Sequence, residues 1–266
     1  MADNLEQMSA EVSQDGFLDG RFTLIQPKKG LRAGSDALYL SASVPAKPGQ
    51  SIVEAGIGTG AAALALLTRV PDTRLLGIEN FAPHAELARA NADLNEMTER
   101  LAIIEGDVLA LKADDMSRDG FACPFDHAMA NPPFFDPAEN RRGRSASRNA
   151  ANVMSVDGLV SWVKNLSAWV RPGGTVTFVH RIEAFPQLLA AMDHALGDIH
   201  VLPLCATAGK DARRVLVQGI KGNKAPMKLI APFVLHEADG RHTCQSEAVL
   251  RGGKAIDLRR QGLALL

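Results

Sequence analysis

The sequence has little cysteine and no disulfide pattern. Its three cysteines, Cys123, Cys205 and Cys244, are far apart and odd in number. This argues against a disulfide framework and a CxxC metal cage, and it is typical of a protein in the reducing cytoplasm. The seven histidines form no HxH or HExxH spacing, so no metal site is expected. A GxSxG motif is also missing, which argues against the nucleophile elbow of a hydrolase.

Long apolar runs and an excess of charge of one sign are absent as well. Charged side chains interrupt every hydrophobic stretch before it reaches the roughly 20 residues of a membrane span. Residues 1–17 are polar and acidic and lack the apolar core of a signal peptide. Lys and Arg number 29 against 30 Asp and Glu, a net charge of −1. This balance excludes a uniformly basic coat for nucleic acid and leaves a local basic patch open.

Short apolar runs alternate with longer helical patterns along most of the chain. The runs are residues 51–56, 74–79, 101–107, 125–130 and 175–180. Their order predicts right-handed βαβ units around a mostly parallel sheet. Two further runs, 199–206 and 213–222, are close enough to form a hairpin, which adds an antiparallel strand. We expect a flexible tail over residues 1–20 and a single domain over residues 21–266.

A glycine-rich turn follows the first predicted strand, in the segment Glu54-Ala55-Gly56-Ile57-Gly58-Thr59-Gly60. Alternating glycines let the backbone turn sharply and approach a ligand without interference from Cβ atoms. Glu79 ends the next strand, where a carboxylate can accept both hydroxyls of a ribose. Asp107 ends the third strand, where it can accept from an adenine amino group. A nicotinamide cofactor needs the same features, so these residues alone leave the nucleotide open.

The segment Asn131-Pro132-Pro133-Phe134 follows the fourth predicted strand. The carboxyl ends of parallel strands meet at one edge of a sheet, where open α/β sheets bind their ligands. The tetrapeptide is therefore expected to face the same crevice as the glycines. A rigid proline-rich loop is the alternative interpretation.

The segments EAGIGTG, GIEN, EGD and NPPF, in this order over residues 54–134, resemble the class I S-adenosylmethionine-dependent methyltransferases. In that superfamily NPPF is the signature of amino-methyltransferases. Gln26–Gly30 and Gly34–Leu38 resemble a narrower branch, the bacterial enzymes that methylate the exocyclic amine of an anticodon-loop adenine in valine tRNA. The resemblance implies an α/β Rossmann-like fold with a mostly parallel seven-stranded sheet, an antiparallel C-terminal strand and helices on both faces. It also implies S-adenosylmethionine as cofactor, and tRNA or another nucleic acid as partner.

The resemblance assigns roles to individual residues. Those expected to hold the cofactor are Gly34, Ser35, Asp36, Glu54, Ala55, Gly56, Gly58, Gly60, Glu79, Asn80, Asp107, Val108 and Asn131. Those expected to present the acceptor are Asn131, Pro132, Pro133 and Phe134. The Asn131 side-chain oxygen and the Pro132 carbonyl would each accept one hydrogen of the amine. Pro133 would fix the backbone, and Phe134 would stack on an unstacked base.

Basic residues and tryptophans complete the candidate features. The aperiodic stretch 135–152 contains four arginines that we expect to contact a phosphate backbone, with a solvated loop as the alternative: Arg141, Arg142, Arg144 and Arg148. A second basic cluster is interpreted as a solvated face of the predicted hairpin: Lys210, Arg213, Arg214, Lys221, Lys224 and Lys228. Trp162 and Trp169 share one face of a helix and are interpreted as core residues.

Three functions are compatible with these observations. The first is an S-adenosylmethionine-dependent N-methyltransferase acting on adenine in RNA, above all tRNA. The second is a methyltransferase of the same fold that acts on a protein glutamine amide or, as an O-methyltransferase, on a small-molecule hydroxyl. The third is a non-catalytic RNA- or dinucleotide-binding module, because a fold alone does not establish activity. The sequence leaves a monomer and a homodimer equally open.

Overall fold

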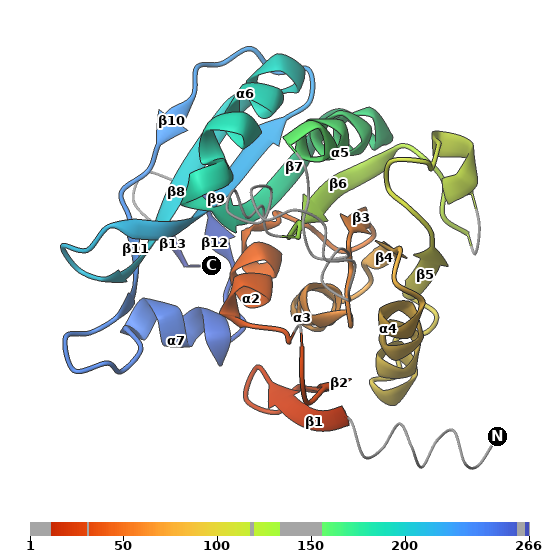
Figure 1. The fold of residues 1–266 in the computed structure, drawn as a ribbon, viewed down its shortest axis with the longest axis horizontal. Helices are drawn as coiled ribbons and strands as arrows, with labels where there is room; N and C mark the ends of the chain where they lie inside the picture. Colours follow the sequence, from red (N-terminus) through yellow and green to blue (C-terminus); the bar gives the residue numbers. More distant parts are fainter. Residues whose placement is uncertain (1–11, 31, 118–119, 134–155, 260–263, 266) are drawn as a thin grey trace, which may run out of the picture.

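The computed structural model describes residues 12–30, 32–117, 120–133, 156–259 and 264–265. A central sheet is built from β3 (Ser51–Ala55), β4 (Arg74–Glu79), β5 (Leu101–Glu105), β6 (Phe125–Ala130), β7 (Val170–Arg181), β8 (Gly197–Thr207), β9 (Ala212–Ile220), β10 (Lys228–Leu229) and β11 (Phe233–His236). The strand order is β10-β8-β9-β7-β6-β3-β4-β5, and β11 also pairs with β8 (Figure 1). This is the Rossmann-like α/β architecture that the alternation of strands and helices predicts.

Strand directions confirm the mostly parallel sheet. The strand β3 pairs in parallel with β4 and β6, and β5 and β7 extend the parallel ladder on either side. The strand β9 runs antiparallel to both β7 and β8, so the hairpin is also confirmed. The number of strands differs from the seven expected, because β10 and β11 add two short parallel pairings with β8. The apolar run over residues 229–237 predicts one further strand, whereas the structure has two short strands with Pro232 between them.

Helices cover both faces of the sheet. One face is covered by α2 (Ser35–Ser43), α3 (Ala61–Arg69) and α4 (Ala82–Leu94), and the other by α5 (Val156–Trp169) and α6 (Phe185–Ala195) (Figure 1). Successive residues of β3 serve different cores, since Ile52 packs under the first set and Val53 under the second. A parallel strand that is covered on both faces therefore has mostly apolar residues in succession and not in alternation. Among the described helices none combines the length and the apolarity that a bilayer crossing requires.

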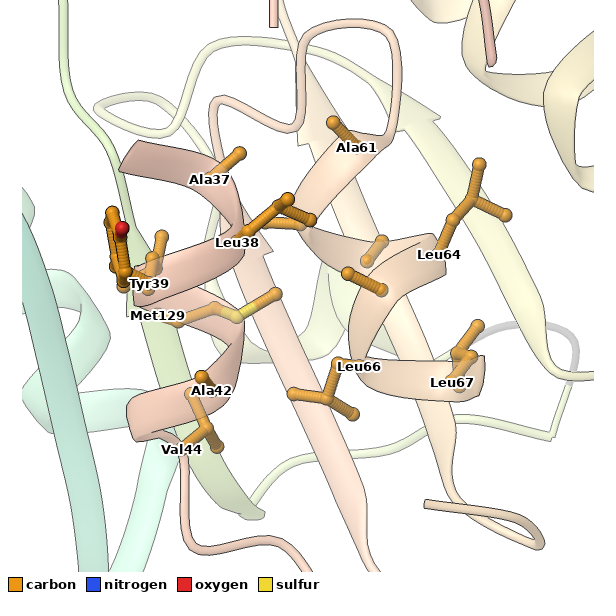
Figure 2. Packing of buried hydrophobic residues seen from close by; sticks show 14 of the residues in the cluster. Ala37, Leu38, Tyr39, Ala42, Val44, Ala61, Leu64, Leu66, Leu67 and Met129 are labelled. Atoms are coloured by element: carbon orange, nitrogen blue, oxygen red, sulfur yellow. The ribbon is translucent and has the colours of Figure 1, made fainter. Parts of the chain in front are cut away.

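Small and branched side chains join α2 to α3. Figure 2 shows Ala37 and Leu38 on the side of α2 that faces α3, with Leu66 on the facing side of α3 and Met129 of β6 nearby. All four side chains are buried. This packing fixes the start of α2 relative to the glycine-rich turn that begins α3.

An antiparallel hairpin, β1 (Val12–Phe17) and β2 (Phe22–Pro27), precedes the sheet. The expectation of a tail over residues 1–20 is thus corrected for residues 12–20, and residues 1–11 lie outside the described part of the chain. The polar sequence of β1 carries no apolar periodicity. Its position instead depends on pairing with β2 and on the stacking of Phe17 on Phe22, with ring centroids 5.3 Å apart.

Two asparagines of α4 attach this hairpin to the rest of the fold. Asn91 accepts from the Ile25 N–H (2.7 Å) and donates to the carbonyls of Ile25 (2.8 Å) and Thr59 (2.9 Å). Asn95 accepts from the Thr23 N–H (2.9 Å) and donates to the Thr23 carbonyl (2.7 Å). The side-chain amides thus pair with β2 as a neighbouring strand would. Because Thr59 belongs to the glycine-rich turn, Asn91 also links the hairpin to that turn.

Candidate active site

A cavity with two lobes lies at the carboxyl ends of β3, β4, β5 and β6. The larger lobe has a volume of about 400 Å³ and the smaller about 100 Å³. The predicted residues that line the cavity are Gly34, Glu54, Gly56, Gly58, Glu79, Asn80, Asp107, Val108, Asn131, Pro132 and Pro133. Segments far apart in the sequence therefore meet at one site, as the positions of the motifs at strand ends predict.

Four of the predicted cofactor residues do not line either lobe. Ser35 is exposed, and Asp36 forms an ion pair with Arg214 of β9 (2.8 Å). Ala55 is fully buried in the sheet. Gly60 caps α3 in the left-handed region, at φ 95°. Five further predicted residues lie outside the described part of the chain: Phe134, Arg141, Arg142, Arg144 and Arg148.

The glycine-rich turn forms an open cradle. Gly56 and Gly58 adopt φ values of 67° and 57°, which disfavour any residue with a side chain. A Cβ atom on Gly56 would lie 2.8 Å from Cη2 of Trp162, whereas a Cβ atom on Gly58 would meet nothing within 4 Å. Position 56 thus needs a glycine both because Trp162 is close and because φ is positive, whereas Gly58 faces open space.

The position of Trp162 extends its predicted role. The side chain is 7% exposed, as expected for a core residue. It also lines the larger lobe, next to Gly56 and Val108. Helical spacing identifies the buried face of α5, but it does not tell what that face covers.

Glu79 is held in a defined orientation by the backbone. Its Oε2 accepts from the Gly58 N–H (2.8 Å) and its Oε1 from the Phe81 N–H (2.9 Å). Each carboxylate oxygen can accept more than one hydrogen bond, so both keep capacity for the hydroxyls of a ribose. Asp107 is similarly oriented, because its Oδ1 accepts from the Leu109 N–H (2.9 Å).

Glu54 is an unusual carboxyl group. It is 2% exposed, and within the described part of the chain its Oε2 has no hydrogen-bond partner. Burial, together with the charge of Glu79, raises the pKa of Glu54 well above its usual value, against a smaller lowering by the Ala63 N–H. A buried acceptor without a partner, on the wall of the smaller lobe, suits a cationic ligand group such as an ammonium.

The cavity also includes a segment that the sequence signals only through Gln26–Gly30 and Gly34. Residues 27–30 and 32–34, here called the strap, contribute Pro27, Lys29, Gly30, Arg32, Ala33 and Gly34 to the lining. Gln26 accepts from the Ala33 N–H (2.9 Å), and both Gln26 and Arg32 donate to Asp15 (2.8 Å each). Phe81 and His84 were not predicted to line the cavity either.

Comparisons with known proteins agree with this geometry. The chain matches the methyltransferase small domain over residues 27–172. It is 28% identical to a tRNA1(Val) (adenine(37)-N6)-methyltransferase of Aeromonas hydrophila, over 86% of this chain and 92% of the relative. An enzyme of the same name from Porphyromonas gingivalis is 36% identical, over 86% and 91%. A solved structure described as a predicted O-methyltransferase from Agrobacterium tumefaciens has a TM-score of 0.67 and 25% identity, over 83% and 97%.

The fold and the cavity define an S-adenosylmethionine-dependent methyltransferase of the Rossmann-like class. The polar groups that line the cavity fit this cofactor, since Glu79 would hold the ribose, Asp107 the adenine amine and Glu54 the methionine ammonium. Within that class, the chain belongs to the methyltransferase small domain family. Among the described residues, no cluster of three or more His, Cys, Asp or Glu could hold a metal ion.

Proposed function

We propose that this enzyme methylates an exocyclic amine, the N6 of an adenine in tRNA. The observation that carries the proposal is the position of Asn131. This residue lines both lobes of the cavity. From that position its amide oxygen can accept a hydrogen bond from an amine brought next to the methyl donor.

An adenine amine needs orientation because its lone pair is delocalised into the ring. The Asn131 oxygen and the Pro132 carbonyl can each accept one N–H, which turns the lone pair out of the ring plane. Pro133 limits the backbone freedom of these acceptors. The cofactor supplies the methyl group on a sulfonium, and the chain supplies proximity and alignment. The methylated nitrogen then loses a proton to water, so no strong base is required of the protein.

The choice of adenine rests on the relatives. Both curated relatives are named as adenine N6-methyltransferases of tRNA, and each match covers most of both chains. A glutamine amide could use the same pair of acceptors, and a hydroxyl is the acceptor implied by the description of the Agrobacterium structure. We also propose a cytoplasmic location, because the proposed tRNA substrate is found there.

The basic cluster of the β8–β9 hairpin supports a nucleic-acid partner, because one end of this hairpin lies at the cavity edge of the sheet. In the antiparallel pairing of β9 with β7, Arg214 lies opposite Arg181 at the cavity edge of the sheet, and Ile220 lies opposite Thr175 at the far edge. Lys210, Arg213 and Arg214 therefore lie on the cavity side, and Lys221, Lys224 and Lys228 on the other. Lys221 donates to the carbonyls of Ala168 (3.1 Å) and Val170 (2.8 Å), which gives it a structural role. We propose that the exposed Lys210 and Arg213 contact phosphates that flank the target adenine.

The reaction is tested by methyl transfer from labelled S-adenosylmethionine to tRNA from cells that lack this gene, followed by nucleoside mass spectrometry. We expect a new N6-methyladenosine peak. The variant N131A should lower kcat by about 100-fold or more while cofactor affinity stays within about twofold, because it removes an orienting contact of the acceptor. No incorporation into tRNA despite cofactor binding would refute the tRNA proposal. Protein and small-molecule acceptors would then be tested with the same label.

The partner surface is tested with two matched double variants of the same hairpin. K210A/R213A should weaken tRNA binding and reduce the salt dependence of log K by about one unit for each lost phosphate contact. K224A/K228A removes two lysines at the opposite edge and should change neither the affinity for tRNA nor its salt dependence. Equal losses in both variants would contradict the proposed surface, whereas the nucleoside assay would still report on the acceptor.

A further inference from the structure

The two lobes of the cavity share four lining residues: Gly56, Gly58, His84 and Asn131. The larger lobe contains Glu79 and Asp107, the partners expected for the ribose and the adenine. The smaller lobe contains Glu54, the partner expected for the methionine ammonium. In the cofactor, the sulfur is bonded to both the ribose methylene and the methionine chain. The sulfur must therefore pass where the lobes meet, beside these four residues.

His84 is the one histidine among the described residues that line the cavity. It lies in the first turn of α4 and is half-buried. Its ring packs edge-on against Phe81, with centroids 4.9 Å apart, which limits its rotation. An imidazole is thus held near the expected path of the sulfur, and it lines the same two lobes as the acceptor residue Asn131.

We infer that His84 distinguishes the sulfonium of S-adenosylmethionine from the thioether of S-adenosylhomocysteine. A neutral imidazole tolerates a neighbouring positive charge, whereas an imidazolium repels it. In the transfer, the methyl carbon bonds to the acceptor nitrogen, and the electron pair of the breaking C–S bond stays on sulfur. The sulfur then carries no charge, and an imidazolium beside it is no longer disfavoured. A protonated His84 is therefore compatible with the product and not with the cofactor.

The surroundings set the sign of the pH dependence. Burial lowers the pKa of His84, and the Glu79 carboxylate raises it by a smaller amount. Other charged groups on the cavity wall are Glu54 at the end of β3, Asp107 after β5, and Lys29 and Arg32 of the strap. His84 is thus neutral at neutral pH, and it gains a proton as the pH falls. The nucleoside and amino-acid groups are common to both ligands, so their effects largely cancel in the ratio of the two dissociation constants.

The experiment is calorimetric titration of the full chain with S-adenosylmethionine and with S-adenosylhomocysteine between about pH 5.5 and pH 8, the range in which a histidine titrates. We expect the ratio of the dissociation constants, cofactor over product, to rise by about tenfold toward the acidic end. In H84Q the ratio should change less with pH, and the remaining change comes from Glu54, whose carboxyl group also lines the smaller lobe. The control H194Q alters an exposed histidine at the end of α6 and should behave as the wild type.

A pH-independent ratio in the wild type, or an unchanged pH dependence in H84Q, would overturn the inference. Should H84Q fail to fold, a proton NMR titration of His84 in the wild type gives the same information. The pKa of His84 must then be lower in the complex with S-adenosylmethionine than in the complex with S-adenosylhomocysteine, and equal values would contradict the assignment. Both measurements use binding alone, so they stand whatever the acceptor is.

Discussion

Replacing Glu54 with glutamine should stabilise the cofactor-free protein at neutral pH. The carboxyl group is buried, and burial with the charge of Glu79 raises its pKa well above the usual value. At a pH between the pKa of Glu54 in the unfolded chain and its higher pKa in the folded protein, the folded protein binds more protons than the unfolded chain. In that pH range the free energy of unfolding therefore falls as the pH rises. The glutamine side chain has the shape of the protonated carboxyl and does not titrate.

The magnitude follows from the burial of the carboxyl group. Leaving a buried polar group without a partner costs about 1–3 kcal/mol. The Ala63 N–H offsets part of the effect of burial, so we expect E54Q to be more stable than the wild type by about 1–3 kcal/mol at pH 7. Near the unfolded pKa of about 4.3 the carboxyl group is neutral in the folded protein and only half ionised in the unfolded chain, so the difference should be small there.

The same substitution should weaken cofactor binding, because a bound ammonium favours the ionised form of the Glu54 carboxyl group and a glutamine cannot supply that charge. A hydrogen bond to a charged group contributes about 1.5–3 kcal/mol, which corresponds to a loss of about 10- to 100-fold in affinity. The assay is urea unfolding of both proteins at about pH 4.5 and pH 7, with and without S-adenosylhomocysteine. A variant less stable than the wild type at pH 7 without ligand would refute the linkage argument. Unchanged affinity would refute the assignment of Glu54 to the ammonium.

Two further substitutions test the framework of the site by urea unfolding and ligand titration. G56A should destabilise the protein by about 2–4 kcal/mol, because of its positive φ and the close approach of Trp162, and W162F in the same chain should restore part of the loss. A G56A protein as stable as the wild type would contradict that contact. N91A should cost about 2–4 kcal/mol and lower cofactor affinity, because it leaves buried groups of β2 and of Thr59 without partners. The matched variant N95A removes contacts to β2 and to the Asn91 carbonyl of its own helix but none to the glycine-rich turn, so a similar loss of affinity there would exclude a specific role for Asn91.

Much of the site could be predicted because its signals are local. Gly56 and Gly58 are needed for positive φ values within one turn, and Glu79 and Asp107 stand at the ends of short apolar runs. Other features depend on contacts between distant segments. Asp36 pairs with Arg214, 178 residues away, and no local pattern distinguishes that role from cofactor binding.

The same reason explains what sequence reasoning missed or placed differently. His84 lies in an ordinary helix start, and only the fold brings it to the junction of the two lobes. The strand β1 has no apolar repeat and forms because β2 is already held by α4. The short strands β10 and β11 depend on the exposed edge of β8. In each case the partner lies outside the sequence window in which periodicity can be read.

The strap has both ends fastened to one another. Gln26 holds the Ala33 N–H, and Arg32 donates to the Pro27 carbonyl (2.9 Å), so the segment closes on itself as a ring. Pro27 lines the larger lobe and Ala33 the smaller, so these two contacts set the walls of both lobes. Loosening either contact would therefore disturb both halves of a ligand that occupies the cavity.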